Sequence, residues 1–147
     1  MNRDGVTVLV PSGWHLTLRR LNGVFDPVTV FTISTFPLRP GRAGSGICSA
    51  ALQRAWTRDG AYVQLAAERD GVSRRRMLHR VPQRPRHFTL DAKGAGGLCT
   101  PADSGEVAFQ DKGRAFYVFY GFGRSASLGT RAAAASMFDL MQIAPRR

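Results

Sequence analysis

The sequence predicts a single α+β domain over residues 1–147, an antiparallel β-sheet of about five or six strands with a short middle helix and a longer C-terminal helix packed on it. Three observations support this fold class. Strand-like segments fill most of the chain, one Ala-rich segment near its end has a helical period, and helices do not alternate regularly with the strands. We see no internal repeat or linker, and 147 residues fit one domain.

The N-terminal third is predicted to form three strands. Val6–Val10 is a short apolar strand, and residues 14–21 alternate between apolar and polar side chains, which is the period of a half-buried strand. Residues 28–38 are rich in β-branched and aromatic side chains and are closed by Pro37 and Pro40. We expect the first two strands to be neighbours in the sheet.

The middle of the chain contains the shorter helix. After a glycine-rich stretch, apolar residues recur at helical spacing, which predicts a helix that begins at Ser45 or Cys48 and ends at Trp56. Residues 61–68 form the next predicted strand, and residues 86–91 form another short one.

The C-terminal part contains the clearest local signals. Residues 106–110 and 114–122 are predicted to form a β-hairpin around an Asp-Lys-Gly turn. A hydroxyl residue, Ser127 or Thr130, is then expected to cap an Ala-rich helix that runs to Ile143.

Short motifs spread along the chain carry a family resemblance. They are Gly13-Trp14-His15, Asp26-Pro27, Ser34–Leu38, Cys48, Asp59–Ala61, Arg84–Phe88, Cys99 and Gly113–Phe116. In this order they resemble small uncharacterised actinobacterial domains, which are in turn similar to the Mog1/PsbP-like fold. The resemblance implies an antiparallel sheet with helices on its faces and a frequent location outside the cytoplasm, and it implies no catalytic residue.

The two cysteines, Cys48 and Cys99, allow two interpretations. They lie too far apart for a C-x-x-C redox motif, and no histidine accompanies them at zinc-ligand spacing. They form either a disulfide, which would remove about 4 kcal/mol of unfolded-state entropy, or two buried thiols that act as small hydrophobic groups. We favour the disulfide, and with it an oxidising compartment.

The charge of the chain is strongly positive. The formal net charge is +11, and only Lys93 and Lys112 among the 21 basic residues are lysines. Such a chain attracts anionic surfaces and phosphate polymers. A general preference for arginine, alanine and glycine explains the charge equally well, so the charge alone does not define a binding site.

Positive charge is concentrated between Ser73 and His87. We assign anion or partner binding to five arginines of this segment, namely Arg74, Arg75, Arg76, Arg80 and Arg84. The segment contains no Phe, Tyr or Trp, so it predicts electrostatic attachment to an anionic surface or a protein rather than base readout. The alternative is a cytoplasmic nucleic-acid-binding protein that uses the same loop, residues 74–86, to follow phosphates.

No segment has the specificity of a catalytic, cofactor or metal motif. Gly121–Ala126 has the G-x-G-x-x-A form of a dinucleotide fingerprint, but no second strand follows its helix, so only anion binding at a helix N-terminus stays open there. Asp103 and Glu106, the nearest pair of carboxylates, are more simply a polar turn. We therefore expect a non-enzymatic binding module without a cofactor; a small enzyme with an unrecognised site is the less favoured alternative.

The location follows from the same observations. No apolar run approaches the roughly 18 residues of a membrane-spanning helix, and the first ten residues lack the apolar region of a secretory signal. The predicted disulfide and the family resemblance favour a location outside the cytoplasm, with the export signal absent from this chain. A cytoplasmic location with reduced cysteines is the alternative, and the sequence indicates neither the partner nor the oligomeric state.

Overall fold

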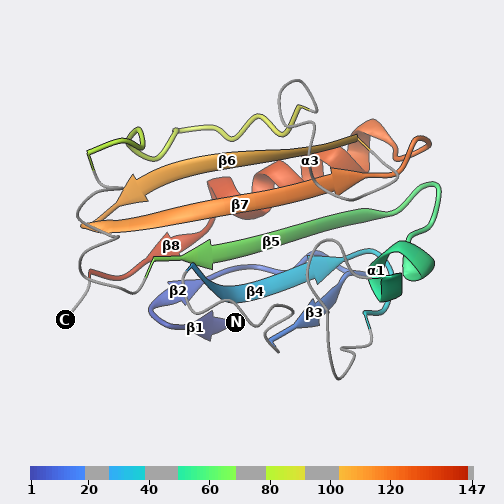
Figure 1. Cartoon of the computed structure of the whole chain (residues 1–147), viewed down its shortest axis with the longest axis horizontal. Helices are drawn as coiled ribbons and strands as arrows, with labels where there is room; N and C mark the ends of the chain where they lie inside the picture. Colours follow the sequence, from blue (N-terminus) through green and yellow to red (C-terminus); the bar gives the residue numbers. More distant parts are fainter. Residues whose placement is uncertain (19–26, 39–49, 69–78, 92–102, 146–147) are drawn as a thin grey trace.

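The computed structural model of the chain describes residues 1–18, 27–38, 50–68, 79–91 and 103–145. These residues form a mixed α and β structure that consists mostly of antiparallel sheet (Figure 1). Its elements are β1 (Asn2–Arg3), β2 (Val6–Thr7), β3 (His15–Thr17), β4 (Val28–Ser34), α1 (Ala50–Ala55), β5 (Ala61–Ala67), β6 (Asp103–Asp111), β7 (Arg114–Phe122), α3 (Leu128–Asp139) and β8 (Gln142–Ile143).

The larger sheet has five strands in the order β3-β4-β5-β7-β6, all antiparallel to their neighbours. The predicted hairpin is confirmed as β6 and β7, although β6 begins earlier than expected, at Asp103. Lys112 and Gly113 connect the two strands with φ values of 49° and 71°. Positive φ at both positions gives the turn a backbone twist that matches the twist of the flanking strands.

The smaller sheet has three strands in the order β1-β2-β8, where the sequence predicted only one sheet. Its strand β8 replaces the end of the predicted C-terminal helix, which ends at Asp139 and not at Ile143. Met141 and Ile143 are both buried, and Ile143 pairs with Val6 of β2. Alternate buried residues fit a strand as well as a helix end, so the hydrophobic pattern alone did not locate this boundary.

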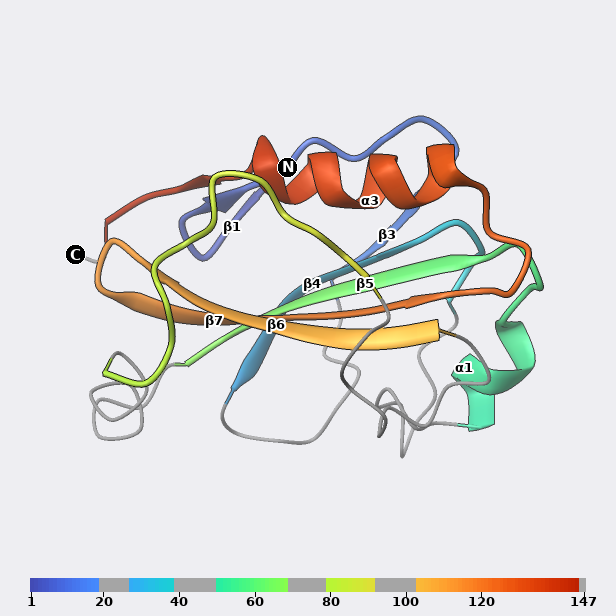
Figure 2. The same cartoon turned by 90° about the horizontal axis from the view of Figure 1, so that it is seen from above.

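The main core lies between α3 and one face of the five-stranded sheet (Figure 2). Ser127 caps the helix, because its Oγ accepts a hydrogen bond from the Thr130 amide at 3.0 Å. Phe138 of α3 stacks on Phe31 of β4, with the ring centroids 6.4 Å apart. Each strand contributes alternate residues to this face, and across β4, β5, β7 and β6 one row of the register is Phe31, Leu65, Val118 and Val107.

The opposite face of β4 and β5 is buried as well, but its side chains are mostly polar. They are Thr29, Thr32, Ser34, Tyr62 and Gln64, each at most 1% exposed. The Tyr62 hydroxyl donates to Gln64 Oε1 at 2.6 Å, and Gln64 Nε2 donates to Thr29 Oγ1 at 2.7 Å. These bonds satisfy groups that would otherwise be costly to bury.

Two predicted elements differ from the structure. Among the described residues, the middle segment forms the six-residue helix α1, which lies near one end of the sheet, away from α3 (Figure 2). Its Leu52 packs with Phe36 and Tyr62 in a separate, smaller core cluster. Residues 86–91 do not form a strand; within the part of the chain that the structure describes, only Gln83 bridges to Gln110 of β6. Phe88 and Leu90 insert into the core instead, and burial of these side chains also explains the alternating pattern.

Candidate functional site

The structure describes the second half of the predicted basic segment. We call residues 79–91 the basic strap; it contains Arg80 and Arg84 and runs beside β6 (Figure 1). The other three assigned arginines, Arg74, Arg75 and Arg76, lie outside the described residues, as do both cysteines of the predicted disulfide, Cys48 and Cys99.

The basic strap is fixed to the body of the protein along its length. Its residues Val81, Phe88 and Leu90 are buried, and the Phe88 ring meets Phe109 edge-on with the centroids 5.3 Å apart. The backbone of Gln110 in β6 exchanges two hydrogen bonds of 2.8 Å with the strap, accepting one from the Arg84 amide and donating one to the Pro82 carbonyl. The strap therefore holds a defined position against the edge of the sheet.

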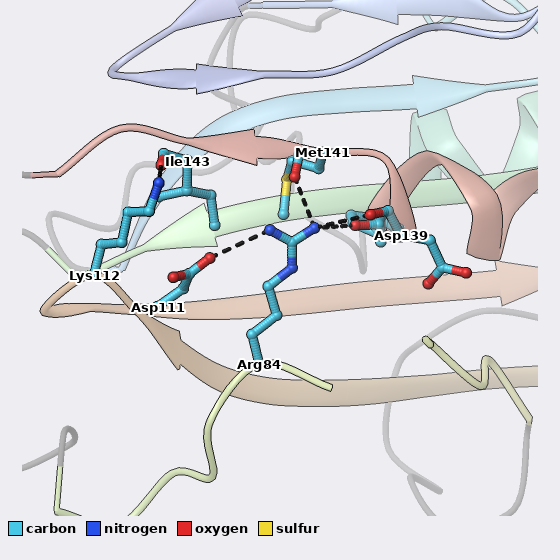
Figure 3. A network of polar contacts seen from close by, with 7 residues as sticks. Arg84, Asp111, Lys112, Asp139, Met141 and Ile143 are labelled. Carbon is cyan, nitrogen blue, oxygen red and sulfur yellow. Dashed lines mark hydrogen bonds and ion pairs between the residues drawn. The ribbon is translucent and has the colours of Figure 1, made fainter. Parts of the chain in front are cut away.

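Arg84 makes the strongest attachment (Figure 3). Its Nη1 donates to Asp111 Oδ2 at 3.2 Å. Its Nη2 donates to the carbonyl oxygens of Phe138, Met141 and Asp139 at 2.6, 2.7 and 3.3 Å. One guanidinium thus joins the strap, the β6–β7 hairpin and the segment that leads from α3 to β8.

This network explains where α3 ends. The last carbonyl groups of a helix have no intrahelical partner and carry partial negative charge, so a guanidinium there satisfies them and interacts favourably with the helix dipole. The Arg84 side chain is only 19% exposed. Both hydrogens of Nη2 and one of Nη1 are occupied by protein acceptors, which leaves Arg84 little capacity to hold a large external partner.

Arg80 and Arg86 differ from Arg84, because both are exposed. Neither forms an ion pair with a carboxylate of the described residues. Two exposed histidines, His79 and His87, lie beside them on the same strap. Arg80 and Arg86 therefore give the outer surface of the strap positive charge that no carboxylate of the described residues pairs with.

Asp139 connects the strap with the C-terminal end of α3. Its Oδ1 accepts a hydrogen bond from the Phe88 amide at 2.7 Å, and its Oδ2 lies 3.5 Å from Nδ1 of His87. Sequence reasoning did not identify Asp111 and Asp139 as partners of this segment. Their side chains are 27 and 51 residues away from the strap groups they bind, and no local pattern reports such contacts.

The carboxylates at the start of β6 do not form an acid–base pair. Residues three apart on a strand point to opposite faces, and Asp103 forms an ion pair with Arg131 at 3.0 Å. Partial burial raises the pKa of Glu106 above its usual value. Glu68, which shares this face of the sheet, accepts a hydrogen bond from the Tyr117 hydroxyl at 3.1 Å. Within the described ranges, no three metal-ligating side chains gather into a group that could hold an ion.

Tyr62 on the polar face of the sheet does not act as an ionised nucleophile. Burial raises the pKa of Tyr62 far above its usual range, so this hydroxyl stays protonated and acts as a hydrogen-bond donor. Two backbone amides of the glycine-rich segment before α3 are already hydrogen-bonded within the protein and are not available to an anion. The amides of Gly123 and Ser125 donate to the carbonyl oxygens of Gly60 and Arg58.

Comparison with known proteins gave no match among family models, curated proteins or solved structures. The resemblance to the Mog1/PsbP-like fold therefore stays a prediction. In the part of the chain that the structure describes, no helix is both long enough and apolar enough to cross a membrane.

Proposed function

We propose that this protein is a non-enzymatic binding module whose basic segment, residues 74–86, attaches it to an anionic surface. The supporting observation is the combination of rigidity and free charge on the strap. Val81, Phe88, Leu90 and the Arg84 network fix its position, while Arg80 and Arg86 remain exposed and without a carboxylate partner among the described residues.

Rigidity matters because it lowers the entropy cost of binding. A flexible cationic loop must be ordered when it meets a surface, whereas an anchored strap already presents its charges together. Exposed arginines without internal partners keep their full charge for the surface. The net charge of the whole chain, +11, adds a long-range attraction that depends on ionic strength.

A nucleic acid is a less favoured partner. Proteins that bind single strands combine positive charge with aromatic rings on which bases stack. The ring of Phe88, the one Phe, Tyr or Trp within the strap, is buried against Phe109 and Phe138. Electrostatic attachment requires no such ring, so the strap fits an anionic surface better than it fits bases.

The experiment replaces Arg74, Arg75, Arg76 and Arg80 together by serine and measures sedimentation with phosphatidylglycerol vesicles at low salt. We expect a loss of binding on the order of a hundredfold or more, since each cation near an anionic bilayer contributes about 1 kcal/mol. Unchanged vesicle binding would reject the proposal. If the variant instead loses affinity for single-stranded DNA and vesicles bind neither protein, the nucleic-acid alternative is correct.

The location outside the cytoplasm is tested by the cysteines. We expect titration of the purified, unreduced protein with a thiol reagent to find no free thiol, and reduction to release two. Removal of the Cys48–Cys99 disulfide should then lower the free energy of unfolding by about 4 kcal/mol. Two reactive thiols without reductant would favour the cytoplasmic alternative.

A further inference from the structure

A pocket of about 580 Å³ lies where the three-stranded sheet meets the turn of the β6–β7 hairpin. The polar residues of its wall are Asn2, Thr7, Arg84, Asp111, Lys112 and Gln142. In Figure 3, Arg84 reaches toward Asp111 and the Met141 carbonyl, and Lys112 reaches toward the Ile143 carbonyl. The volume is in the range of small-molecule sites, and the exposed strap arginines Arg80 and Arg86 do not line it.

The charges in this pocket do not cancel. Asp111 is the one carboxylate of the wall, and Arg84 neutralises it at 3.2 Å. The Lys112 ammonium instead donates to the Ile143 carbonyl at 2.6 Å, and a carbonyl is a neutral acceptor. Among the described residues of the wall, one positive charge therefore remains without a carboxylate partner, which favours an anion over a cation or a neutral molecule.

Lys112 holds this position despite an unfavourable backbone. Its φ of 49° places it in the left-handed region, at the first position of a two-residue turn. Asn, Asp or Gly is preferred at such a position, because other side chains crowd the neighbouring carbonyl. A lysine in place of a locally better residue is consistent with a use for its charge.

We propose that this pocket binds the phosphate group of a small polar molecule, with the Lys112 ammonium supplying the attracting charge. A phosphate monoester carries between one and two negative charges at neutral pH and offers acceptor oxygens on several sides. After its bond to Ile143, Lys112 still has two N–H groups to donate, and one Nη1 hydrogen of Arg84 has no acceptor among the described residues.

The rest of the wall indicates the remainder of the ligand. Asn2 and Gln142 carry amides and Thr7 carries a hydroxyl, groups that hydrogen-bond hydroxyl groups of a ligand. No described residue of the wall carries an aromatic ring, so these residues do not offer the stacking surface that a nucleobase uses. A phosphorylated polyol fits this chemistry. The site goes beyond the proposed attachment to a surface, because its central charge is not on the strap.

The test is a titration of the full chain with glycerol 3-phosphate, followed by backbone amide NMR at near-physiological salt, which weakens non-specific attraction. We expect saturable shifts at residues 112 and 142–144, and none with glycerol. Lys112→Asn removes the charge while giving the turn its preferred Asn-Gly sequence, so the melting temperature should not fall. The dissociation constant should rise about tenfold or more, since a charge-assisted hydrogen bond is lost.

Two controls make the outcome decisive. Arg80→Asn removes the same charge outside the pocket and should leave the dissociation constant unchanged, and Lys112→Arg should restore most of the affinity. Vesicles that contain phosphatidic acid test the other source of the same chemistry; Lys112-dependent shifts with vesicles alone would identify a lipid head group as the ligand. Shifts that do not saturate, or equal weakening by Lys112→Asn and Arg80→Asn, would overturn the proposal.

Discussion

Arg80 and Arg84 lie on the same strap, but Arg84 is bonded to other segments of the protein whereas Arg80 is exposed to solvent. The Arg84 guanidinium contacts one carboxylate and three backbone carbonyl groups from two other segments (Figure 3). Arg80 is exposed and forms no ion pair with a carboxylate of the described residues. Arginine is suited to both positions, because its planar guanidinium donates in several directions and stays charged at all relevant pH values.

The difference shows that an arginine-rich segment is not one functional unit. Arg84 stabilises the fold by closing the C-terminal end of α3, and in doing so it positions the strap that carries Arg80 and Arg86. A loss of surface binding therefore has two possible origins, loss of the charge itself or loss of the strap's position. Variants of Arg84 and Asp111 test the position of the strap through stability, and variants of the exposed arginines test the charge itself.

The largest effect is expected for Arg84→Met, which keeps much of the side-chain volume and removes the donors. Asp111 and the Met141 carbonyl would lose the guanidinium in a half-buried environment, and the Phe138 carbonyl would keep only backbone donors such as the Met141 amide at 3.3 Å. We expect the free energy of unfolding, measured by urea denaturation, to fall by roughly 2–4 kcal/mol. Arg84→Lys should fall between the wild type and Arg84→Met, because an ammonium cannot reproduce the planar fork. A loss below about 0.5 kcal/mol would mean that the Arg84 bonds contribute little to the stability of the fold.

A smaller effect is expected for Asp111→Asn. The amide keeps the shape of the carboxylate, and the three carbonyl contacts of Arg84 remain, so only the charge of one partly exposed pair is lost. We expect a loss of about 1 kcal/mol in the free energy of unfolding. Comparison with Arg84→Met shows how much of the stabilisation comes from the ion pair with Asp111 and how much from the bonds to the carbonyl groups at the end of α3. An Asp111→Asn variant as unstable as Arg84→Met would show that the ion pair dominates.

The sequence predicted the parts of this architecture that depend on local patterns. Runs of strand-forming residues predicted β4 and β5, the tight turn predicted the β6–β7 hairpin, and the Ala-rich period predicted α3. It did not predict that β8 forms from the last part of the expected helix. That outcome depends on Arg84 closing the helix and on the pairing of Ile143 with Val6, two contacts between distant parts of the chain.

The candidate site was predictable only as a concentration of charge. The sequence shows that arginines are concentrated in residues 74–86, but it does not distinguish Arg84 from Arg80. That distinction requires Asp111 and the end of α3 to lie beside the strap, which is a property of the tertiary structure. The same holds for Lys112, whose sequence signal is limited to a lysine in a turn position that usually holds Asn, Asp or Gly.

The central claim is that the strap, and not the overall charge, carries the binding surface. Its most direct test compares two double variants of equal net charge, Arg80→Ser with Arg86→Ser on the strap and Arg58→Ser with Arg124→Ser elsewhere. All four arginines are exposed, so we expect both variants to keep the wild-type melting temperature.

The measurement is the partition coefficient of each variant onto phosphatidylglycerol vesicles at low salt. We predict a loss of about thirtyfold for the strap variant, from about 1 kcal/mol for each charge close to the bilayer, and a loss of no more than a few-fold for the variant with Arg58 and Arg124 replaced. Equal losses for the two variants would contradict the account, because attachment would then depend on net charge alone.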